Sequence, residues 1–246
     1  GAAAVVAERP VESAPARLLL VPSARRAMAV AAANFHGRPA DAMKLAGVTG
    51  TNGKTTITYL VEACAQEAGL PIGVLGTVSY RFAGQEREAS HTTPESTEIQ
   101  ALLAEMHRAG TKAVVMEVSS HALAQERVAG VRFAAAGFTN LTRDHLDYHG
   151  DMASYGAAKA KLFDWPGLRA AAVNLDDAFG RELFDAVGGK VRALGFSSRG
   201  AAGAAVRAES LVLDGSGIRF LLHAGGQAHP LRSPLLGRFN VDNLLA

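Results

Sequence analysis

The sequence predicts an α/β fold, with a P-loop-type and mostly parallel sheet, helices on both faces and a terminal antiparallel hairpin. From about residue 44 onwards, apolar runs of strand length alternate with helix-forming stretches, which is typical of a parallel sheet covered on both sides. The first run leads into GVTGTNGKTT at 47–56, a glycine-rich turn typical of phosphate-binding loops. Near the end, Asp-Gly-Ser-Gly joins two apolar runs within 210–225 and indicates the hairpin.

The segment before residue 44 contains two short apolar runs, within 1–10 and 11–23. The stretch 23–35 begins with serine and is rich in alanine, which predicts a helix. Gly37 and Pro39 interrupt the pattern after it. A linker is therefore expected before the large sheet begins.

The alternating part contains six predicted strands and four predicted helices. The strands are expected at 44–50, 72–82, 113–120, 133–141, 169–177 and 191–198, and the helices at 55–69, 96–110, 121–130 and 177–188. A polar loop is expected from the second strand to about residue 94. A second polar stretch, 142–163, ends in YGAAKAKLF, which is rich in helix formers.

Composition excludes several classes of protein. The 246 residues carry 25 basic and 23 acidic side chains without a dense basic run, so no nucleic-acid surface is indicated. No apolar run reaches the roughly 18 residues of a membrane span, and the start lacks the features of a secretion signal. The single cysteine, Cys64, cannot form an internal disulfide. It suits a reducing cytoplasm and is expected to be buried.

The predicted sheet brings polar residues to one edge, because open parallel sheets bind ligands outside the carboxyl ends of their strands. The first strand ends at the loop with Lys54, and the third ends at Glu117. The fourth ends at Thr139 and Asn140, with His145 shortly after. These residue types bind phosphate and metal, so small molecules are the expected partners.

Three of these candidates have a simpler interpretation. An acid that follows a strand and faces a P-loop usually holds magnesium, although Glu117 could equally be an exposed strand end; the loop favours the metal. His145 alone fits a solvated loop. By pattern, Lys159 is a solvated helix residue.

HTTPES at 91–96 is a turn with hydroxyl groups before a predicted helix. Capping of that helix accounts for Ser96 or Thr97 without any ligand. Thr92 and Thr93 are then left over, and hydroxyl groups beside a helix start also bind anions. A phosphorylated or carboxylated substrate is therefore a reasonable hypothesis for this turn.

Five stretches together resemble the Mur ligases, namely GVTGTNGKTT, HTTPES, MEVSSHALAQERV, NLTRDHLDYHG and YGAAKAKLF. The general P-loop pattern has glycine where Val48 stands, and the family's variant loop, with Gly47, Gly50 and Gly53, explains this departure. The resemblance implies a cytoplasmic, monomeric, ATP-dependent ligase of peptidoglycan precursor synthesis. It would join a diamino acid to UDP-N-acetylmuramoyl-L-alanyl-D-glutamate through an acyl phosphate. Of the two candidates, meso-diaminopimelate is favoured over L-lysine by its broader use among bacteria, not by any residue of this sequence.

The resemblance also implies a role for each matched residue. ATP would contact Gly50, Thr51, Asn52, Gly53, Lys54, Thr55, Thr56 and Asn240. Magnesium would be held by Thr55, Glu117, His145 and a carbamylated Lys159, and the residues expected to take part in catalysis are Lys54, Lys159 and His145. The UDP-muramoyl peptide would contact His91, Thr92, Thr93, Ser119, Gln125 and Arg127. His91 stands where some relatives carry asparagine.

Members of the family have three domains. The resemblance assigns residues 1–44 to the C-terminal part of a smaller N-terminal UDP-binding α/β domain, and residues 45–246 to the central ATP-binding domain. The C-terminal domain, which would carry the amino-acid pocket, has no counterpart in the sequence. The chain is therefore expected to be a fragment that cannot complete ligation alone.

Two alternatives remain open. A sister ligase, such as folylpolyglutamate synthase or cyanophycin synthetase, would share the loop and the carbamylated lysine, although SSHALAQERV and DHLDYHG favour the peptidoglycan branch. A P-loop nucleotide-binding module without ligase activity would exchange or hydrolyse nucleotide. Such a module would have no use for HTTP, His145 and Lys159 together.

Overall fold

The fold was analysed in a computed structural model that describes residues 3–11 and 17–246. The strands are β1 (Ala4–Ala7), β2 (Arg17–Leu20), β3 (Lys44–Thr49), β4 (Ile72–Leu75), β5 (Ser79–Phe82), β6 (Gln85–Glu88), β7 (Ala113–Glu117), β8 (Phe133–Phe138), β9 (Ala170–Asn174), β10 (Arg192–Ser197), β11 (Val206–Asp214), β12 (Gly217–Ala224) and β13 (Gln227–Ser233). The helices are α1 (Ala24–Phe35), α2 (Lys54–Glu67), α3 (Ser96–Arg108), α4 (Ser120–Ala124), α5 (Leu146–His149), α6 (Met152–Ala160), α7 (Ala178–Val187) and α8 (Phe239–Leu245), with short 3-10 turns η1 (Pro39–Asp41) and η2 (Lys161–Asp164).

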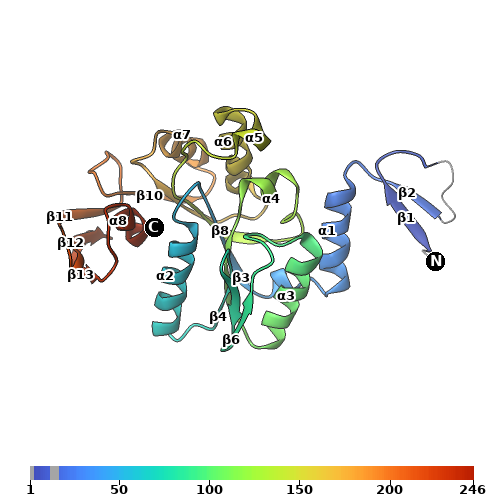
Figure 1. The fold of residues 1–246 in the computed structure, drawn as a ribbon, viewed down its shortest axis with the longest axis horizontal. Helices are drawn as coiled ribbons and strands as arrows, with labels where there is room; N and C mark the ends of the chain where they lie inside the picture. The colour runs from blue at the N-terminus through green and yellow to red at the C-terminus, as the bar shows by residue number, and fades with distance from the viewer. Residues whose placement is uncertain (1–2, 12–16) are drawn as a thin grey trace.

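A mixed sheet of 11 strands forms the centre, in the order β13-β12-β11-β10-β9-β8-β3-β7-β4-β5-β6. The strands from β11 to β4 in this order run parallel, and the antiparallel strands β12 and β13 at one edge and β5 and β6 at the other complete the sheet. The predicted P-loop-type α/β fold is confirmed. In Figure 1, β1 and β2 lie at one end of the long axis, and β11–β13 lie with α8 at the other.

Side chains of the central strands alternate between two helix layers, as period-2 strands require. Val114 and Met116 on β7 join the main core with Ile99 of α3. Val115 between them packs in a separate cluster with Ile57 of α2. Helices therefore cover both faces of the sheet, as predicted.

Two edges of the sheet differ from the prediction. The strand expected at 72–82 is two antiparallel strands, β4 and β5, and β6 continues the edge inside the segment expected to be a loop. The predicted hairpin forms as β11 and β12, but β13 extends it. Every residue of β6 and most of β13 are exposed, so their sequences carry no apolar alternation and only backbone pairing defines them.

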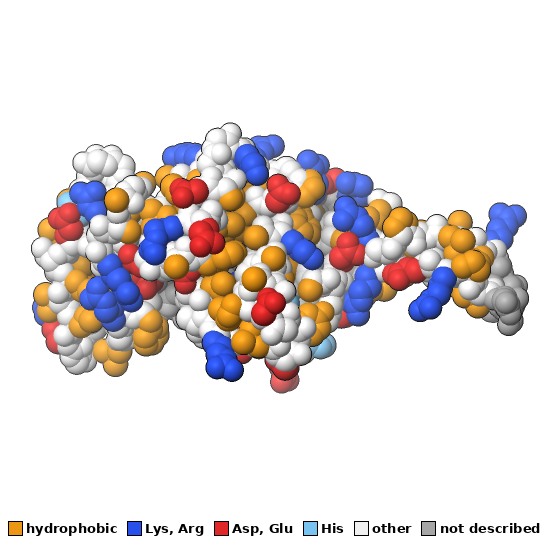
Figure 2. Space-filling model, turned by 90° about the horizontal axis from the view of Figure 1, so that it is seen from above, with side chains coloured by type: hydrophobic (Ala, Val, Ile, Leu, Met, Phe, Trp, Pro, Cys, Tyr) orange, Lys and Arg blue, Asp and Glu red, His pale blue; other side chains and the backbone are white. Residues whose placement is uncertain are grey.

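Helix α1 connects β1 and β2 to the body of the protein. Parts of the apolar runs predicted within 1–10 and 11–23 fall on residues 1–2 and 12–16, outside the described residues; the remainder forms β1 and β2. Ala29 of α1 is fully buried, and a Cβ on Gly130 would lie 2.6 Å from its carbonyl oxygen. The small residues let α1 pack closely on the body, from which the N-terminal segment projects (Figure 2).

Cys64 is exposed on α2, so the expectation that it is buried is wrong. It falls on the side of the helix turned away from the sheet, whereas Ile57 and Ala65 are buried. None of the helices in the described part of the chain has the length and hydrophobicity needed to cross a bilayer.

Candidate active site

The site begins at the loop between β3 and α2. Gly50 has a φ angle of +143° and Gly53 one of +91°, which are backbone conformations that favour glycine. A Cβ on Gly50 would clash with Thr139 at the end of β8. Because α2 begins at Lys54, the N–H groups of its first turn have no helical carbonyl partner and are available to an anion.

The end of β8 holds this loop in place. Asn52 N donates to Asn140 Oδ1 at 2.9 Å, and Asn140 Nδ2 donates to Asn52 O at 3.1 Å. Thr139 Oγ1 donates to the same carbonyl at 2.6 Å, and Thr51 N donates to Asn140 O at 2.8 Å. The polar residues predicted at the ends of β3 and β8 therefore contact each other. The backbone N–H groups of Thr51 and Asn52 hold the loop in its conformation.

Two lysines converge on the loop from different helices. Lys54 Nζ donates to Gly50 O at 2.9 Å and to Thr51 O at 2.8 Å. Lys159 Nζ, from α6, donates to the same Gly50 O at 2.9 Å. Lys159 is only 1% exposed, so its interpretation as a solvated helix residue is wrong. Its apolar neighbours along α6 gave no indication of which face would be buried.

Burial and proximity lower the basicity of both amines. Burial lowers the pKa of Lys54, although Glu117 and Asp144 oppose the shift. Burial and the charge of Lys54 lower the pKa of Lys159 to about 7. The half-buried Lys54 and the fully buried Lys159 meet at one carbonyl oxygen, so the site favours an anion, and Lys159 is partly a neutral amine near neutral pH.

Glu117, at the end of β7, is fully buried and hydrogen-bonded. Its Oε1 accepts from Thr77 N at 2.8 Å, and its Oε2 accepts from the hydroxyls of Thr77 and Thr55, both at 3.0 Å. A Cβ on Gly76 would lie 2.6 Å from Oε1. The sequence missed Thr77 because the turn that carries it was hidden inside a strand predicted at 72–82.

The residues at this point fit magnesium and a nucleotide phosphate. The Glu117 carboxylate and Thr55 hydroxyl are hard oxygen ligands that Mg²⁺ prefers, and they already lie within 3.0 Å of each other. Lys54 lies on the same turn as Thr55. A metal bound there would neutralise phosphoryl charge next to the P-loop.

His145 lies in the segment between β8 and α6, with a φ angle of +53°. Its ring packs edge-on against His121 with centroids 4.8 Å apart, and its Nε2 is 3.4 Å from the Asp144 carboxylate. Among the residues that the structure describes, no three His, Cys, Asp or Glu side chains form a metal-binding group. The metal-binding role of His145 stays a prediction.

A cavity of about 480 Å³ adjoins the P-loop and extends to α8, within the size range of small-molecule sites. Its lining includes Asn52, Gly53, Thr56, Thr139, Phe239, Asp242 and Asn243. A Cβ on Gly53 would clash with Asn243. Helix α8 therefore closes directly onto the loop and forms the second wall of the cavity.

Asn240, predicted to contact the nucleotide base, is not among the cavity-lining residues. Its Nδ2 donates to Leu236 O at 2.8 Å, and its Oδ1 accepts from Asn243 Nδ2 at 2.9 Å. Asn243 and the exposed Phe239 face the cavity in its place. The motif GRFNVDN contains all three residues, but only the position of α8 against the loop decides which of them line the cavity.

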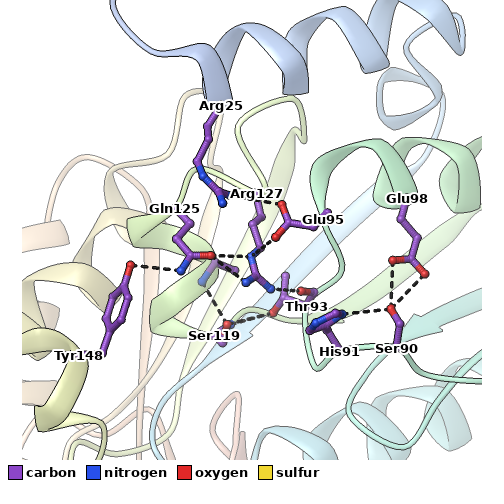
Figure 3. A network of polar contacts seen from close by, with 11 residues as sticks. Arg25, Ser90, His91, Thr93, Glu95, Glu98, Ser119, Gln125, Arg127 and Tyr148 are labelled. Carbon is purple, nitrogen blue, oxygen red and sulfur yellow. Dashed lines mark hydrogen bonds and ion pairs between the residues drawn. The ribbon is translucent and has the colours of Figure 1, made fainter. Parts of the chain in front are cut away.

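Four of the residues predicted to bind a muramoyl peptide, Thr93, Ser119, Gln125 and Arg127, form a connected network (Figure 3). The ring of His91 contacts Ser90 instead, and Thr92 accepts a hydrogen bond from Thr77. Arg127 donates to Gln125 Oε1 from Nε at 2.9 Å and from Nη2 at 2.7 Å, and to Thr93 O from Nη1 at 3.0 Å. Gln125 Nε2 also donates to Tyr148 at 3.3 Å. Ser119 caps α4 by accepting from Ala122 N at 3.1 Å. These residues lie next to the carboxyl end of β7.

The HTTPES turn divides into exposed and buried parts. His91 is exposed, Thr92 is half-buried, and Thr93 is only 1% exposed. Thr93 Oγ1 donates to Glu117 O at 2.8 Å and accepts from Ser119 N at 3.0 Å, so this hydroxyl joins the turn to β7. The predicted cap at Ser96 or Thr97 is wrong, because Glu95 is the N-cap of α3 and both residues lie inside its first turn. The buried hydroxyl of Ser96 has no partner among the described residues.

Comparison with known proteins agrees with this architecture. A family model described as the Mur ligase middle domain matches residues 48–246. The UDP-N-acetylmuramoyl-L-alanyl-D-glutamate--2,6-diaminopimelate ligase of Xanthomonas campestris pv. campestris is 55% identical over 249 residues, which cover 100% of this chain and 50% of that protein. A solved structure of a ligase with the same name has a TM-score of 0.89 at 31% identity and covers 99% of this chain and 50% of that one.

More distant neighbours share only the fold. The folylpolyglutamate synthase of Mycobacterium tuberculosis has a TM-score of 0.71 at 16% identity, over 89% of this chain and 57% of that one. The chain spans about half the length of the curated relatives it matches. Because the family model extends over the P-loop, the buried lysine and α8, this chain belongs to the Mur ligase family.

Proposed function

We propose that the protein containing this chain is an ATP-dependent ligase that adds meso-diaminopimelate to UDP-N-acetylmuramoyl-L-alanyl-D-glutamate. The observation that carries the proposal is the pairing of Lys54 and Lys159 on Gly50 O, beside a P-loop cavity and the Glu117 carboxylate. The names of relatives at 55% and 51% identity support the choice of substrates. We further propose that the protein is a cytoplasmic monomer. Residues 1–44 would form the C-terminal part of its UDP-binding domain.

ATP and magnesium would supply the phosphoryl group and the charge neutralisation that convert the peptide carboxylate into an acyl phosphate. The chain's own residues position this chemistry. Lys54 and the first turn of α2 would hold the phosphates, while Thr55 and Glu117 would hold the metal. His145 would complete the metal's ligands after rotating away from Asp144.

Lys159 would act as a carbamate. Its amine is partly neutral near pH 7, and a neutral amine can add carbon dioxide, forming an N–C bond and releasing one proton. The resulting anion would remove a buried positive charge and provide oxygen ligands for magnesium. Incubation with isotopically labelled bicarbonate should give a carbamate signal that Lys159→Met abolishes.

Arg127, Gln125, Ser119 and the 91–93 turn would bind the UDP-muramoyl peptide. A guanidinium suits a carboxylate or phosphate partner, and the network lies next to Glu117 through Thr93. The peptide carboxylate would then meet the phosphates near the end of β7.

Phosphate release tests the proposal in the full-length protein. The protein is given ATP, magnesium and UDP-N-acetylmuramoyl-L-alanyl-D-glutamate, together with meso-diaminopimelate or L-lysine in separate reactions. Release should require both the nucleotide peptide and meso-diaminopimelate. Release that is indifferent to the nucleotide peptide would support a sister ligase or a nucleotidase, and preference for L-lysine would change only the third substrate.

A further inference from the structure

Three groups hold the guanidinium of Arg127, namely the side chains of Glu95 and Gln125 and the backbone carbonyl of Thr93. Its Nε lies 3.0 Å from Glu95 Oε1 and also donates to Gln125, while Nη1 and Nη2 each use one N–H on Thr93 and Gln125. A guanidinium has five N–H groups, so one N–H on each terminal nitrogen remains for a ligand. Glu95 pairs with Nε alone, so it restrains the guanidinium and leaves these two N–H groups available.

Glu95 connects Arg127 to α1. Its second oxygen, Oε2, lies 3.3 Å from Nη1 of Arg25 in the first turn of that helix. Figure 3 shows Arg25 reaching down from α1 to one oxygen of Glu95, with Arg127 below it at the other oxygen. One carboxylate thus bridges two arginines from segments about a hundred residues apart.

A second acid holds the same end of α1. Glu126 accepts a hydrogen bond from Ser23, the N-cap of α1, and lies 3.6 Å from Arg26. Its φ angle of +56° is unusual for a residue with a side chain. This backbone conformation lets Glu126 pair with α1 while the next residue, Arg127, contacts Thr93 on the site side.

We propose that Glu95 is a positioning residue for Arg127, and that the start of α1 braces it through Arg25. The brace consists of Ser23, Arg25, Arg26, Glu95 and Glu126. It orients the arginine fork toward an acidic group of the UDP-muramoyl peptide, so this inference rests on the proposed function. It also makes the peptide site depend on the segment that precedes the central sheet.

The test measures KM for each substrate separately in the full-length protein. Glu95→Ala should raise the KM for the UDP-muramoyl peptide about fivefold, because a charge-assisted contact that orients a binding group is lost. The KM for ATP should not change, since Lys54 and α8 are untouched. Arg25→Ala should give a smaller rise. The effect of the double variant should be less than additive if Arg25 acts through Glu95.

Glu105→Gln is the matched control. Glu105 lies on α3, the helix whose N-cap is Glu95, and pairs with Arg87 at 2.7 Å, outside the brace. Both KM values should therefore stay unchanged. Glu95→Gln keeps the side-chain shape if Glu95→Ala unfolds. An unchanged peptide KM, a lowered peptide KM or an equal rise in the KM for ATP would each overturn the brace. A wild-type protein without peptide-dependent phosphate release would instead overturn the proposed function itself.

Discussion

At the scale of single residues, the burial of Lys159 lowers the folding stability of the protein, although the proposed reaction needs this side chain. Its pKa of about 7 lies below the usual 10.5 of lysine. Between these values the unfolded chain binds a proton that the folded chain does not, so folding stability rises with pH in this window. Below pH 7 the folded protein buries Lys159 as a cation, so the full free-energy cost of removing that charge from water lowers its stability.

Lys159→Met should therefore stabilise the protein while abolishing ligation. In buffer purged of carbon dioxide, the Tm of the variant should exceed that of the wild type at about pH 6.5, and the difference should shrink toward about pH 9.5. Lys161→Met is the control, because Lys161 is exposed two residues away. A difference that does not change with pH, or retained ligation, would contradict the assigned role.

The sequence predicted part of the arrangement of these residues. Lys54, Thr55 and Glu117 come together as expected from strand ends. The burial of Lys159 follows from the packing of α6 over the P-loop, which local pattern does not encode. Asn240 and Asn243 differ by three residues on one helix, so only tertiary packing decides which one faces the cavity.

At the scale of elements, the junction between β3 and α2 combines backbone strain with function. Gly53, the N-cap of α2, and Gly69, after its last turn, both have positive φ, at +91° and +68°. A Cβ on Gly53 would clash with Asn243, whereas a Cβ on Gly69 meets nothing within 4 Å. A substitution at Gly69 therefore tests backbone strain alone, whereas the same substitution at Gly53 also disturbs the contact between the loop and α8.

Gly53→Ala and Gly69→Ala should each lower the free energy of unfolding by about 1 kcal/mol, because left-handed backbone disfavours a Cβ. Only Gly53→Ala should also weaken binding of a non-hydrolysable ATP analogue, since it displaces α8 from the cavity wall. Urea unfolding and calorimetric titration measure the two effects. Equal loss of ATP affinity in both variants would show that general destabilisation, not the loop, controls binding.

The edge strands of the sheet show which elements cannot be predicted from sequence alone. Buried strands such as β3 and β7 consist mostly of apolar residues, and such runs predict a strand. The exposed residues of β6 and the Pro-containing β13 pair only through backbone groups. Periodicity therefore predicts the centre of this sheet and fails at both of its edges.

At the scale of the whole molecule, the cavity lies between two packing units. The main core surrounds the parallel strands, whereas Phe196, Ile218, Phe220, Val241 and Leu245 form a separate cluster under α8. Between β10 and β11, only Phe196 and Ser197 have paired partners. The strands β11–β13 with α8 therefore depend on this smaller cluster and on contacts with α2.

A nucleotide that contacts both the P-loop and α8 should join the two units. A non-hydrolysable ATP analogue with magnesium should slow hydrogen exchange in α8 and β12 as well as in the first turn of α2, because ligand binding to the folded state suppresses local opening. Amides of β5 and β6, at the far edge of the sheet, serve as the internal control. Ile218→Ala, which truncates a fully buried side chain, should speed exchange in β12 without the ligand, and the analogue should partly reverse this. Protection confined to α2 would mean that α8 lies beside the nucleotide without binding it.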